Sequence, residues 1–229
     1  MNTVADIRDV GVLADDVRRA LYLYVSSQRA SVGRDQAASA LGIPRHQAKF
    51  QLDRLEEAGL LDTDYVRLSG RSGPGAGRPS KVYRRSRREL SISLPGREYA
   101  LAGELMADAI TRSTRDGIPV DQALAHIAAA RGREIGRGHG ESGTPLQIAM
   151  DALAHFGYEP VTDGEQVVLV NCPFHSLAQA HTELVCGMNE ALLGGVCESV
   201  GGISAHLDPG DDRCCVVLRS RTSDARPSE

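Results

Sequence analysis

The chain has 229 residues, of which 41% are hydrophobic and 24% charged, so it is long enough for two modest globular domains. No basic segment followed by an apolar run opens the sequence, and no stretch approaches the roughly 20 apolar residues of a membrane span. We therefore expect a cytoplasmic protein without a membrane segment. Residues 1–92 carry 16 Lys and Arg against 11 Asp and Glu, whereas the remainder carries 10 against 19. This asymmetry predicts that the first part meets a polyanion.

The first 92 residues show a helix-turn-helix pattern. Apolar periodicity predicts a helix capped by Asp15 or Asp16 and ending near Ser27, followed by helices over residues 34–41 and 44–58. The turn Gly42-Ile43-Pro44 separates the second helix from the third. Three residues form the predicted buried stripe of the third helix: Ala48, Leu52 and Leu55.

A basic hairpin is predicted to follow these helices. Strand-like runs at 65–68 and 81–84 flank a segment rich in Gly and Pro, and together they complete a winged helix-turn-helix that binds double-stranded DNA. The alternatives are a winged helix used for protein contacts and basic residues that are merely solvated. The predicted DNA contacts are polar and basic side chains of the third helix and the wing: Arg45, His46, Gln47, Lys49, Arg54, Arg71, Arg78 and Lys81.

Two segments of this region resemble a known group of regulators. Residues 51–61 are similar to the recognition helix of the ArsR/DeoR-like winged-helix repressors, and residues 77–83, Gly-Arg-Pro-Ser-Lys-Val-Tyr, resemble the wing of one branch. The resemblance implies a transcriptional repressor.

The middle of the chain is predicted to be helical. Apolar residues recur at helical spacing over residues 97–115, and Pro119 opens a further helix to about Ile135. Regulators of this kind work as dimers because DNA half-sites repeat by symmetry. We expect the 97–115 helix to contribute to a homodimer interface, with an ordinary core helix as the alternative.

The last part of the chain is predicted to be a small α+β domain. Its elements are a helix at 146–156, a hairpin at 158–170, a helix at 181–199 and a closing hairpin at 203–218. The whole protein is therefore predicted as α+β. Its expected regions are a winged helix over 1–92, a helical dimerisation or linker region over 93–143, and a sensor domain over 144–229.

All five cysteines lie within 44 positions of this last part, and none occurs in the first 171 residues. In a reducing compartment such clustering favours ligation or redox chemistry over a disulfide framework. Cys186 and Cys197 are about 16 Å apart along one helix, so they are not expected to share a site. Strand alternation predicts that Cys214 faces the interior and Cys215 the opposite side. The candidate site therefore comprises Cys172, Cys186 and Cys214.

Three thiolates and a fourth donor can hold zinc or an iron–sulfur cluster. The spacing C-x13-C-x27-C lacks the close cysteine pairs usual for zinc and favours a larger cofactor, while zinc and uncoordinated thiols remain alternatives. The fourth ligand is left open between His175, His181, an external thiol and another protein group. A nucleophilic enzyme that pairs one of these cysteines with a histidine is disfavoured because no Gly-rich anion hole accompanies them, so we do not expect an enzyme.

The organisation of the whole chain resembles the SufR-type iron–sulfur repressors. The shared features are the winged helix, the Gly-Arg-Pro wing, the middle helices and the late cysteines. The family's cysteine pattern maps onto Cys172, Cys186 and Cys214, with one extra residue in the first gap. This resemblance implies a homodimer that holds one cluster per subunit, [4Fe-4S] with [2Fe-2S] as the alternative. It also implies repression of iron–sulfur assembly or redox-stress genes by the cluster-bound form.

Overall fold

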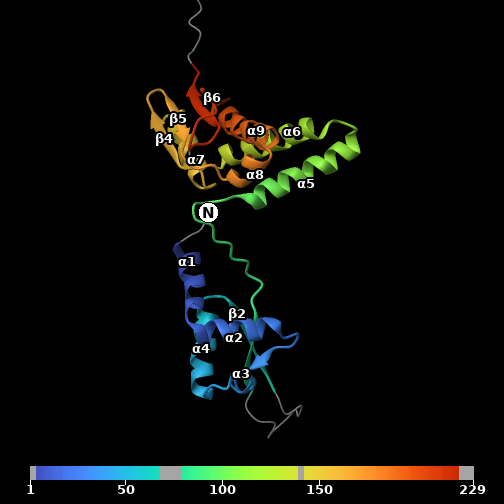
Figure 1. Ribbon diagram of the computed structural model, residues 1–229, viewed down its shortest axis with the longest axis vertical. Coiled ribbons are helices and arrows are strands. Elements are labelled where there is room, and N and C mark those ends of the chain that lie inside the picture. Colours follow the sequence, from blue (N-terminus) through green and yellow to red (C-terminus); the bar gives the residue numbers. More distant parts are fainter. Residues whose placement is uncertain (1–3, 68–78, 139–141, 222–229) are drawn as a thin grey trace, which may run out of the picture. The chain divides into compact units, whose positions relative to one another are not determined.

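The computed structural model describes residues 4–67, 79–138 and 142–221, and the chain divides into two compact units, Asn2–Ile92 and Ser93–Glu229 (Figure 1). Both units combine helices with an antiparallel sheet, which confirms the predicted mixture of helix and sheet. The contacts do not divide the chain into the three predicted regions, because the helices at residues 99–116 and 120–137 share one core with the sheet that follows.

The first unit packs helices against a three-stranded antiparallel sheet of order β1-β3-β2. Asp15 caps α2, its carboxylate accepting a hydrogen bond from the Arg18 amide at 2.9 Å. Gly42 ends α3 in the left-handed conformation, with φ of 65°. The elements are α1 (Val4–Gly11), the 3-10 turn η1 (Val12–Ala14), α2 (Asp16–Ser27), β1 (Val32–Gly33), α3 (Arg34–Leu41), α4 (Arg45–Glu57), β2 (Leu61–Val66) and β3 (Ser80–Arg85). This is a winged helix-turn-helix.

The core of the first unit follows the predicted pattern. Leu21 and Val25 of α2 are buried, and so is the predicted stripe of α4, whose three residues are all fully inaccessible. The strand after α4 begins at Leu61, four residues earlier than predicted, because the whole of β2 pairs with β3 from Leu61↔Arg85 to Val66↔Ser80. The helix α1 was not predicted.

The second unit contains a four-stranded antiparallel sheet of order β4-β5-β7-β6 and five helices among its described residues. Its elements are α5 (Tyr99–Asp116), α6 (Val120–Arg137), α7 (Pro145–Ala154), β4 (Pro160–Asp163), β5 (Gln166–Leu169), α8 (His175–Ala180), α9 (Thr182–Val200), β6 (Ile203–Leu207) and β7 (Val216–Ser220). The short helix α8 was not predicted. The long helix α9 lies against both α6 and the sheet.

Helices α6 and α9 approach each other closely because both present glycine at the contact. A Cβ added at Gly132 would lie 1.9 Å from the carbonyl oxygen of Leu192, and one added at Gly195 would lie 2.1 Å from that of Ala129. Either atom would overlap backbone rather than a movable side chain. The glycines therefore set the distance between the two helices.

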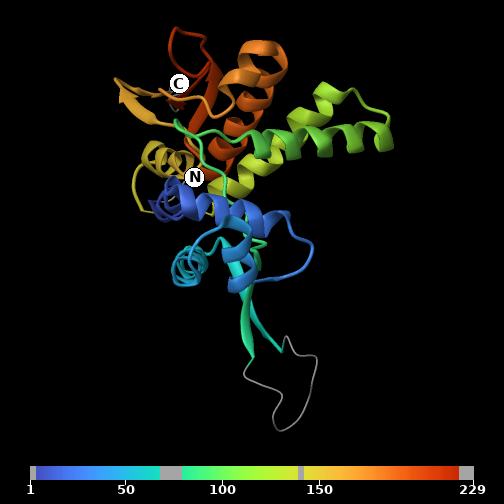
Figure 2. The same ribbon diagram turned by 60° about the horizontal axis from the view of Figure 1, so that its bottom comes forward.

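Helices α5 and α6 form an antiparallel hairpin that extends from the rest of the second unit (Figures 1 and 2). The apolar stripe predicted for a dimer interface is used within the chain: Leu101, Ala102 and Leu105 are buried in the unit's own core. Ile110, farther along α5, is 56% exposed. The alternative interpretation of a core helix therefore fits the first half of α5.

The part of the chain that the structure describes has no helix long and apolar enough to cross a membrane.

Candidate DNA-binding surface and cysteine site

The exposed face of α4 carries most of the residues predicted to contact DNA. With the apolar stripe buried, Arg45, His46, Lys49 and Arg54 are exposed and Gln47 is partly exposed. Phe50 belongs to the same face and is 62% exposed. A polar and basic helix face of this kind, following a turn after α3, is the arrangement that reads DNA in a helix-turn-helix.

Ion pairs within the unit partly neutralise this face. Lys49 Nζ lies 2.9 Å from Asp53 Oδ2, and Arg54 Nη1 lies 2.8 Å from Glu57 Oε2. Arg45 pairs with Asp35 of α3. Such exposed pairs are weak, so these side chains can exchange their partners for phosphate.

Lys81 differs from the prediction that it contacts DNA from the wing. Its ammonium lies 3.0 Å from Asp53 Oδ1 and also pairs with Glu56, and its side chain is 23% exposed. Tyr83 donates a 2.8 Å hydrogen bond to the same Asp53 oxygen. Burial would raise the pKa of Asp53, but hydrogen bonds from Lys49, Tyr83 and Lys81 outweigh it and hold that pKa at about 2. Lys81 therefore fixes α4 to β3.

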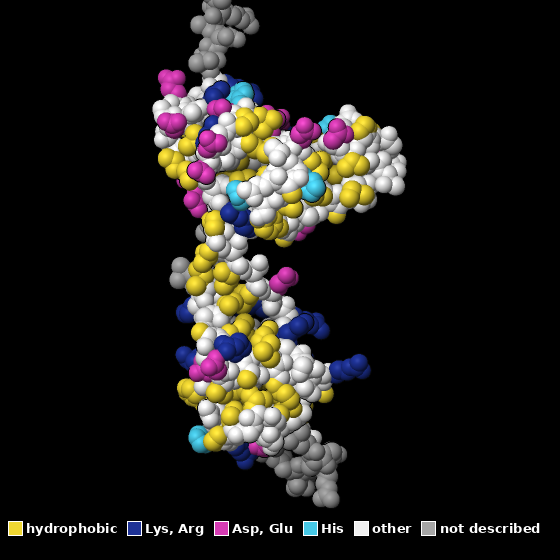
Figure 3. Space-filling view, viewed as in Figure 1, with side chains coloured by type: hydrophobic (Ala, Val, Ile, Leu, Met, Phe, Trp, Pro, Cys, Tyr) yellow, Lys and Arg dark blue, Asp and Glu magenta, His cyan; other side chains and the backbone are white. Residues whose placement is uncertain are grey.

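Two predicted wing contacts, Arg71 and Arg78, lie outside the described residues. On the visible face of the first unit, Figure 3 shows basic side chains more often than acidic ones, whereas acidic side chains are numerous on the second unit. This distribution agrees with the charge counts of the two parts of the chain.

In the second unit, a pocket of about 530 Å³ collects four of the five cysteines. Cys172 follows β5, Cys186 lies in the second turn of α9, and Cys214 and Cys215 precede β7. The structure thus brings the three predicted cysteines to one pocket and adds a fourth.

The loop that carries Cys172 is held by hydrogen bonds from the start of the unit. Arg97 donates to the carbonyl oxygen of Cys172 at 3.2 Å and to the side chain of Asn171. The Glu98 amide donates to the Pro173 carbonyl at 3.1 Å. Because Asn171 is itself buried, the backbone on both sides of Cys172 is fixed.

Cys215 corrects the prediction made from strand alternation. The strand β7 begins only at Val216, so Cys214 and Cys215 lie in an irregular segment where side chains need not alternate. The Cys214 amide donates to the Leu169 carbonyl at 2.8 Å, and the Cys215 carbonyl accepts from the Asp208 amide at 2.8 Å. Both thiols face the same pocket. The adjacent cysteines were the available sequence signal.

The four thiols form a chain of hydrogen bonds. A bond from Cys214 lowers the pKa of Cys172, and bonds from Cys214 and Cys186 lower the pKa of Cys215 to about 6. Burial raises the pKa of Cys186 to about 12, and interactions with the neighbouring Cys172 and Cys215 raise the pKa of Cys214. The pKa is thus lowered for two thiols of the group and raised for the other two.

A buried amide points at one of these sulfurs. Asn189 of α9 is 1% exposed, and its Nδ2 donates to Cys214 Sγ at 3.1 Å. The Tyr158 hydroxyl donates to Asn189 Oδ1, and the Tyr158 ring packs edge-on against Phe174 with centroids 6.4 Å apart. The sequence offered a signal, since Asn189 falls four residues after Val185 on the apolar side of the helix.

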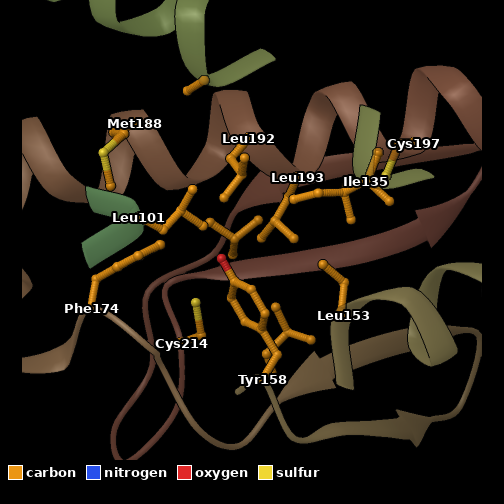
Figure 4. Close-up of a cluster of buried hydrophobic side chains, with 14 of the residues drawn as sticks. Leu101, Ile135, Leu153, Tyr158, Phe174, Met188, Leu192, Leu193, Cys197 and Cys214 are labelled. Atoms are coloured by element: carbon orange, nitrogen blue, oxygen red, sulfur yellow. The ribbon is translucent and has the colours of Figure 1, made fainter. Parts of the chain in front are cut away.

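Cys197 does not belong to the pocket. It is 1% exposed and lies near the C-terminal end of α9, whereas Cys214 lies beside Tyr158 (Figure 4). Burial raises the pKa of Cys197 to about 12, so it behaves as a small apolar side chain. Its separation from the site of Cys186 agrees with the prediction that the two cysteines do not share a site.

The two candidate histidine ligands are placed differently. His175, the first residue of α8, lines the pocket but has an exposed side chain, while His181 is exposed and is not among the described residues that line it. Arg97 and Arg213 also line the pocket and supply positive charge near the thiols.

The donor set fits a thiolate-bound centre in kind, because four sulfurs, an amide donor to sulfur and two nearby cations are present. Among residues 4–67, 79–138 and 142–221, however, no three His, Cys, Asp or Glu side chains are grouped so that they could hold a single metal ion.

The comparisons with known proteins concern the first unit. Residues 13–64 match the family model of a helix-turn-helix domain, a match that covers α2, α3, α4 and the start of β2. No curated protein and no solved structure matches the chain. A helix-turn-helix domain indicates a DNA-binding transcriptional regulator.

Proposed function

We propose that the chain is a homodimeric transcriptional regulator whose affinity for its DNA operator depends on an iron–sulfur cluster held by Cys172, Cys186 and Cys214. The observation that carries the proposal is the convergence of thiols from a loop, a helix and a pre-strand segment on one pocket. Its resemblance to SufR-type repressors further suggests a [4Fe-4S] cluster and a repressor.

The buried amide supports a thiolate at Cys214. A neutral thiol is a weak acceptor, so burying Asn189 to donate to it returns little of the amide's desolvation cost. A thiolate is a strong acceptor, and hydrogen bonds to sulfur are one of the means by which proteins tune iron–sulfur centres. The Tyr158–Asn189–Cys214 arrangement is thus better matched to a ligating sulfur than to a free thiol.

A bound cluster would supply strong bonds that exist only while it is intact. The Cys172 loop, α9 and the segment before β7 would then be linked through their sulfurs, and loss of the cluster would release that link. Because α9 packs on α6 without side chains at the glycine contacts, a shift of α9 moves α6 with it. We propose that the α5–α6 hairpin, with Ile110 exposed, makes the dimer contact and transmits this shift to operator affinity.

The DNA contact is proposed for α4. Arg45, Lys49 and Arg54 are placed for phosphates or guanine edges, and His46 and Gln47 for polar base edges. Lys81 is assigned to the fold rather than to DNA because, unlike the exposed pairs of α4, its side chain is only 23% exposed and is paired with two carboxylates, Asp53 and Glu56.

The test is operator binding by two forms of one preparation. Duplexes that bind the anaerobically reconstituted protein are selected from a random pool, and affinity is then measured before and after the cluster is removed with a chelator. We expect about a tenfold change or more, in the range of allosteric couplings. Equal affinity of both forms would remove cluster control, and no selected duplex would remove DNA binding.

A thiol-based redox sensor is the second candidate, favoured by the hydrogen-bonded thiols themselves. Cys172 and Cys214 contact each other, as do Cys186 and Cys215. Hydrogen peroxide would convert one such pair to a disulfide, taking two electrons and two protons and leaving two waters. Peptide mapping of peroxide-treated, metal-free protein under non-reducing conditions tests this candidate. It requires disulfides in those two pairings, and DNA affinity that changes when they form.

A further inference from the structure

We propose that Cys215 is the fourth thiolate ligand of the cluster, alongside the three thiols already assigned. This inference rests on the function proposed above and deepens it. It replaces the histidines with a residue that strand alternation had excluded.

The position of Cys215 among the sulfurs is the first argument. Its thiol lines the same pocket as those of Cys172, Cys186 and Cys214, and it interacts with its neighbours Cys214 and Cys186. Any centre that binds both of these neighbours therefore lies against Cys215 as well. A cluster bound only by the other three would leave a half-buried sulfur in contact with two ligands but without a bond of its own.

The backbone keeps Cys215 at this place. The preceding amide is tied to β5 through Leu169, and the Cys215 carbonyl is tied to the end of the β6 strand segment through Asp208. The two cysteines are the last residues of the irregular segment before β7. That strand starts at Val216, and its first three residues are buried. These bonds fix the backbone from which both thiols reach the pocket.

The consecutive spacing suits a cluster better than a single ion. Two adjacent thiolates can bind two different iron atoms of one cluster, and thiolates are the usual ligands of such centres. A single zinc ion would need both at one atom, and the described thiols are not grouped around one point. Four thiols that line one pocket thus suit a centre with several iron atoms better than a single ion.

The rival ligand is His175, because it lines the same pocket. Its side chain is exposed on the first turn of α8, whereas Cys215 is only partly exposed and contacts two of the proposed ligands. Arg97 and Arg213 line the pocket too, but Asp211 and Asp212 also line it, so the charge of the lining does not decide between the two candidates.

The experiment compares full-length Cys215→Ser and Cys215→Ala with His175→Ala and with Cys197→Ala, a buried cysteine outside the pocket. Each protein is reconstituted anaerobically with iron and sulfide. Iron and sulfide per chain are measured, together with electron paramagnetic resonance spectra and the rate of iron loss to a chelator. Circular dichroism of the metal-free proteins checks folding, and the serine variant preserves side-chain size.

We expect both Cys215 variants to lose iron to the chelator at least about tenfold faster than wild type and to yield a three-iron centre on mild oxidation. His175→Ala and Cys197→Ala should match wild type. If Cys215 variants match wild type, or if only His175→Ala loses iron, the assignment of Cys215 is overturned while the cluster itself stands. If wild type holds neither iron nor sulfide, the proposed function fails and this assignment with it.

Discussion

Each unit has a polar helix side chain that is withdrawn from solvent, Asp53 partly and Asn189 almost completely, but the two are satisfied differently. In the winged helix, Asp53 of α4 accepts hydrogen bonds from Lys49, Lys81 and Tyr83, so its charge has permanent partners within the fold. In the second unit, Asn189 of α9 donates to Cys214, an acceptor whose strength depends on its state. The first arrangement is complete in the protein alone, and the second becomes strong only when the sulfur is ligated. We infer that the winged helix is the constant part of the molecule and the cysteine unit the responsive part.

The largest effect on stability is expected at the close glycine contact between α6 and α9. Gly195→Ala should destabilise the second unit by about 3 kcal/mol, because the new methyl group overlaps the Ala129 carbonyl and forces α6 and α9 apart. Chemical denaturation followed by circular dichroism measures this. Gly194→Ala is the matched control, since nothing lies within 4 Å of its added Cβ. It should be neutral or stabilising by up to about 1 kcal/mol. Equal effects of both changes would contradict the close contact.

A smaller effect on stability is expected at Asn189, which donates to the Cys214 sulfur. Asn189→Leu should cost the metal-free protein about 2 kcal/mol by leaving the buried Tyr158 hydroxyl without its acceptor. Adding Tyr158→Phe removes the stranded donor and should restore much of that loss. In reconstituted protein, Asn189→Leu should also lower the cluster's reduction potential, because the hydrogen bond to Cys214 sulfur is lost. An unchanged potential would contradict the proposed role of the amide.

In the winged helix, Asp53→Asn should destabilise the first unit by about 1 kcal/mol, a value reduced for its partial exposure. The folded-state pKa of Asp53 is about 2, below its ordinary 3.8, so its contribution is complete above pH 4 and is lost as the pH falls through 2. The difference in unfolding free energy between wild type and variant should shrink over that interval. A difference that stays constant between pH 4 and pH 2 would contradict the assignment.

The smallest effect on stability, under about 0.5 kcal/mol, is expected for Arg54→Ala, because its pair with Glu57 is exposed. This change should nevertheless weaken DNA binding several-fold and reduce the salt dependence by about one counterion. Arg131→Ala is matched to it, since Arg131 forms an equivalent exposed pair with Glu134 in the second unit. Arg131→Ala should leave DNA affinity unchanged, and equal losses in both variants would argue against α4 as the DNA-contacting helix.

The sequence predicted the winged helix well because its signals are local. Helix caps, the turn at Gly42 and the 3.6-residue periodicity each depend on neighbours within one or two turns. The pairing of Lys81 with Asp53 and Glu56 was not predicted because these partners are more than 20 residues away in the sequence. A basic residue next to a basic wing gives no sign that its charge is already neutralised.

For the cysteine unit, the sequence identified which thiols approach one another but misjudged one. The exclusion of Cys215 assumed that the strand began at Cys214, whereas pairing with β6 starts two residues later, at Leu207↔Val216. The partners of Asn189 are Tyr158, which precedes β4, and Cys214, which precedes β7. These residues are distant in the sequence, so only the folded chain brings them together. The close contact of α6 with α9 at Gly132 and Gly195 was not predicted for the same reason, because the two helices are distant in the sequence.

The central claim is that the cysteine unit holds an iron–sulfur cluster, and the most direct test is chemical analysis of anaerobically purified and reconstituted wild-type protein. We predict visible absorbance together with about four iron and four sulfide per chain, or about two of each for the smaller cluster. Both should be absent from a Cys172→Ala/Cys186→Ala/Cys214→Ala variant that remains folded. Wild-type protein that binds zinc without sulfide, or binds no metal at all, would contradict the claim.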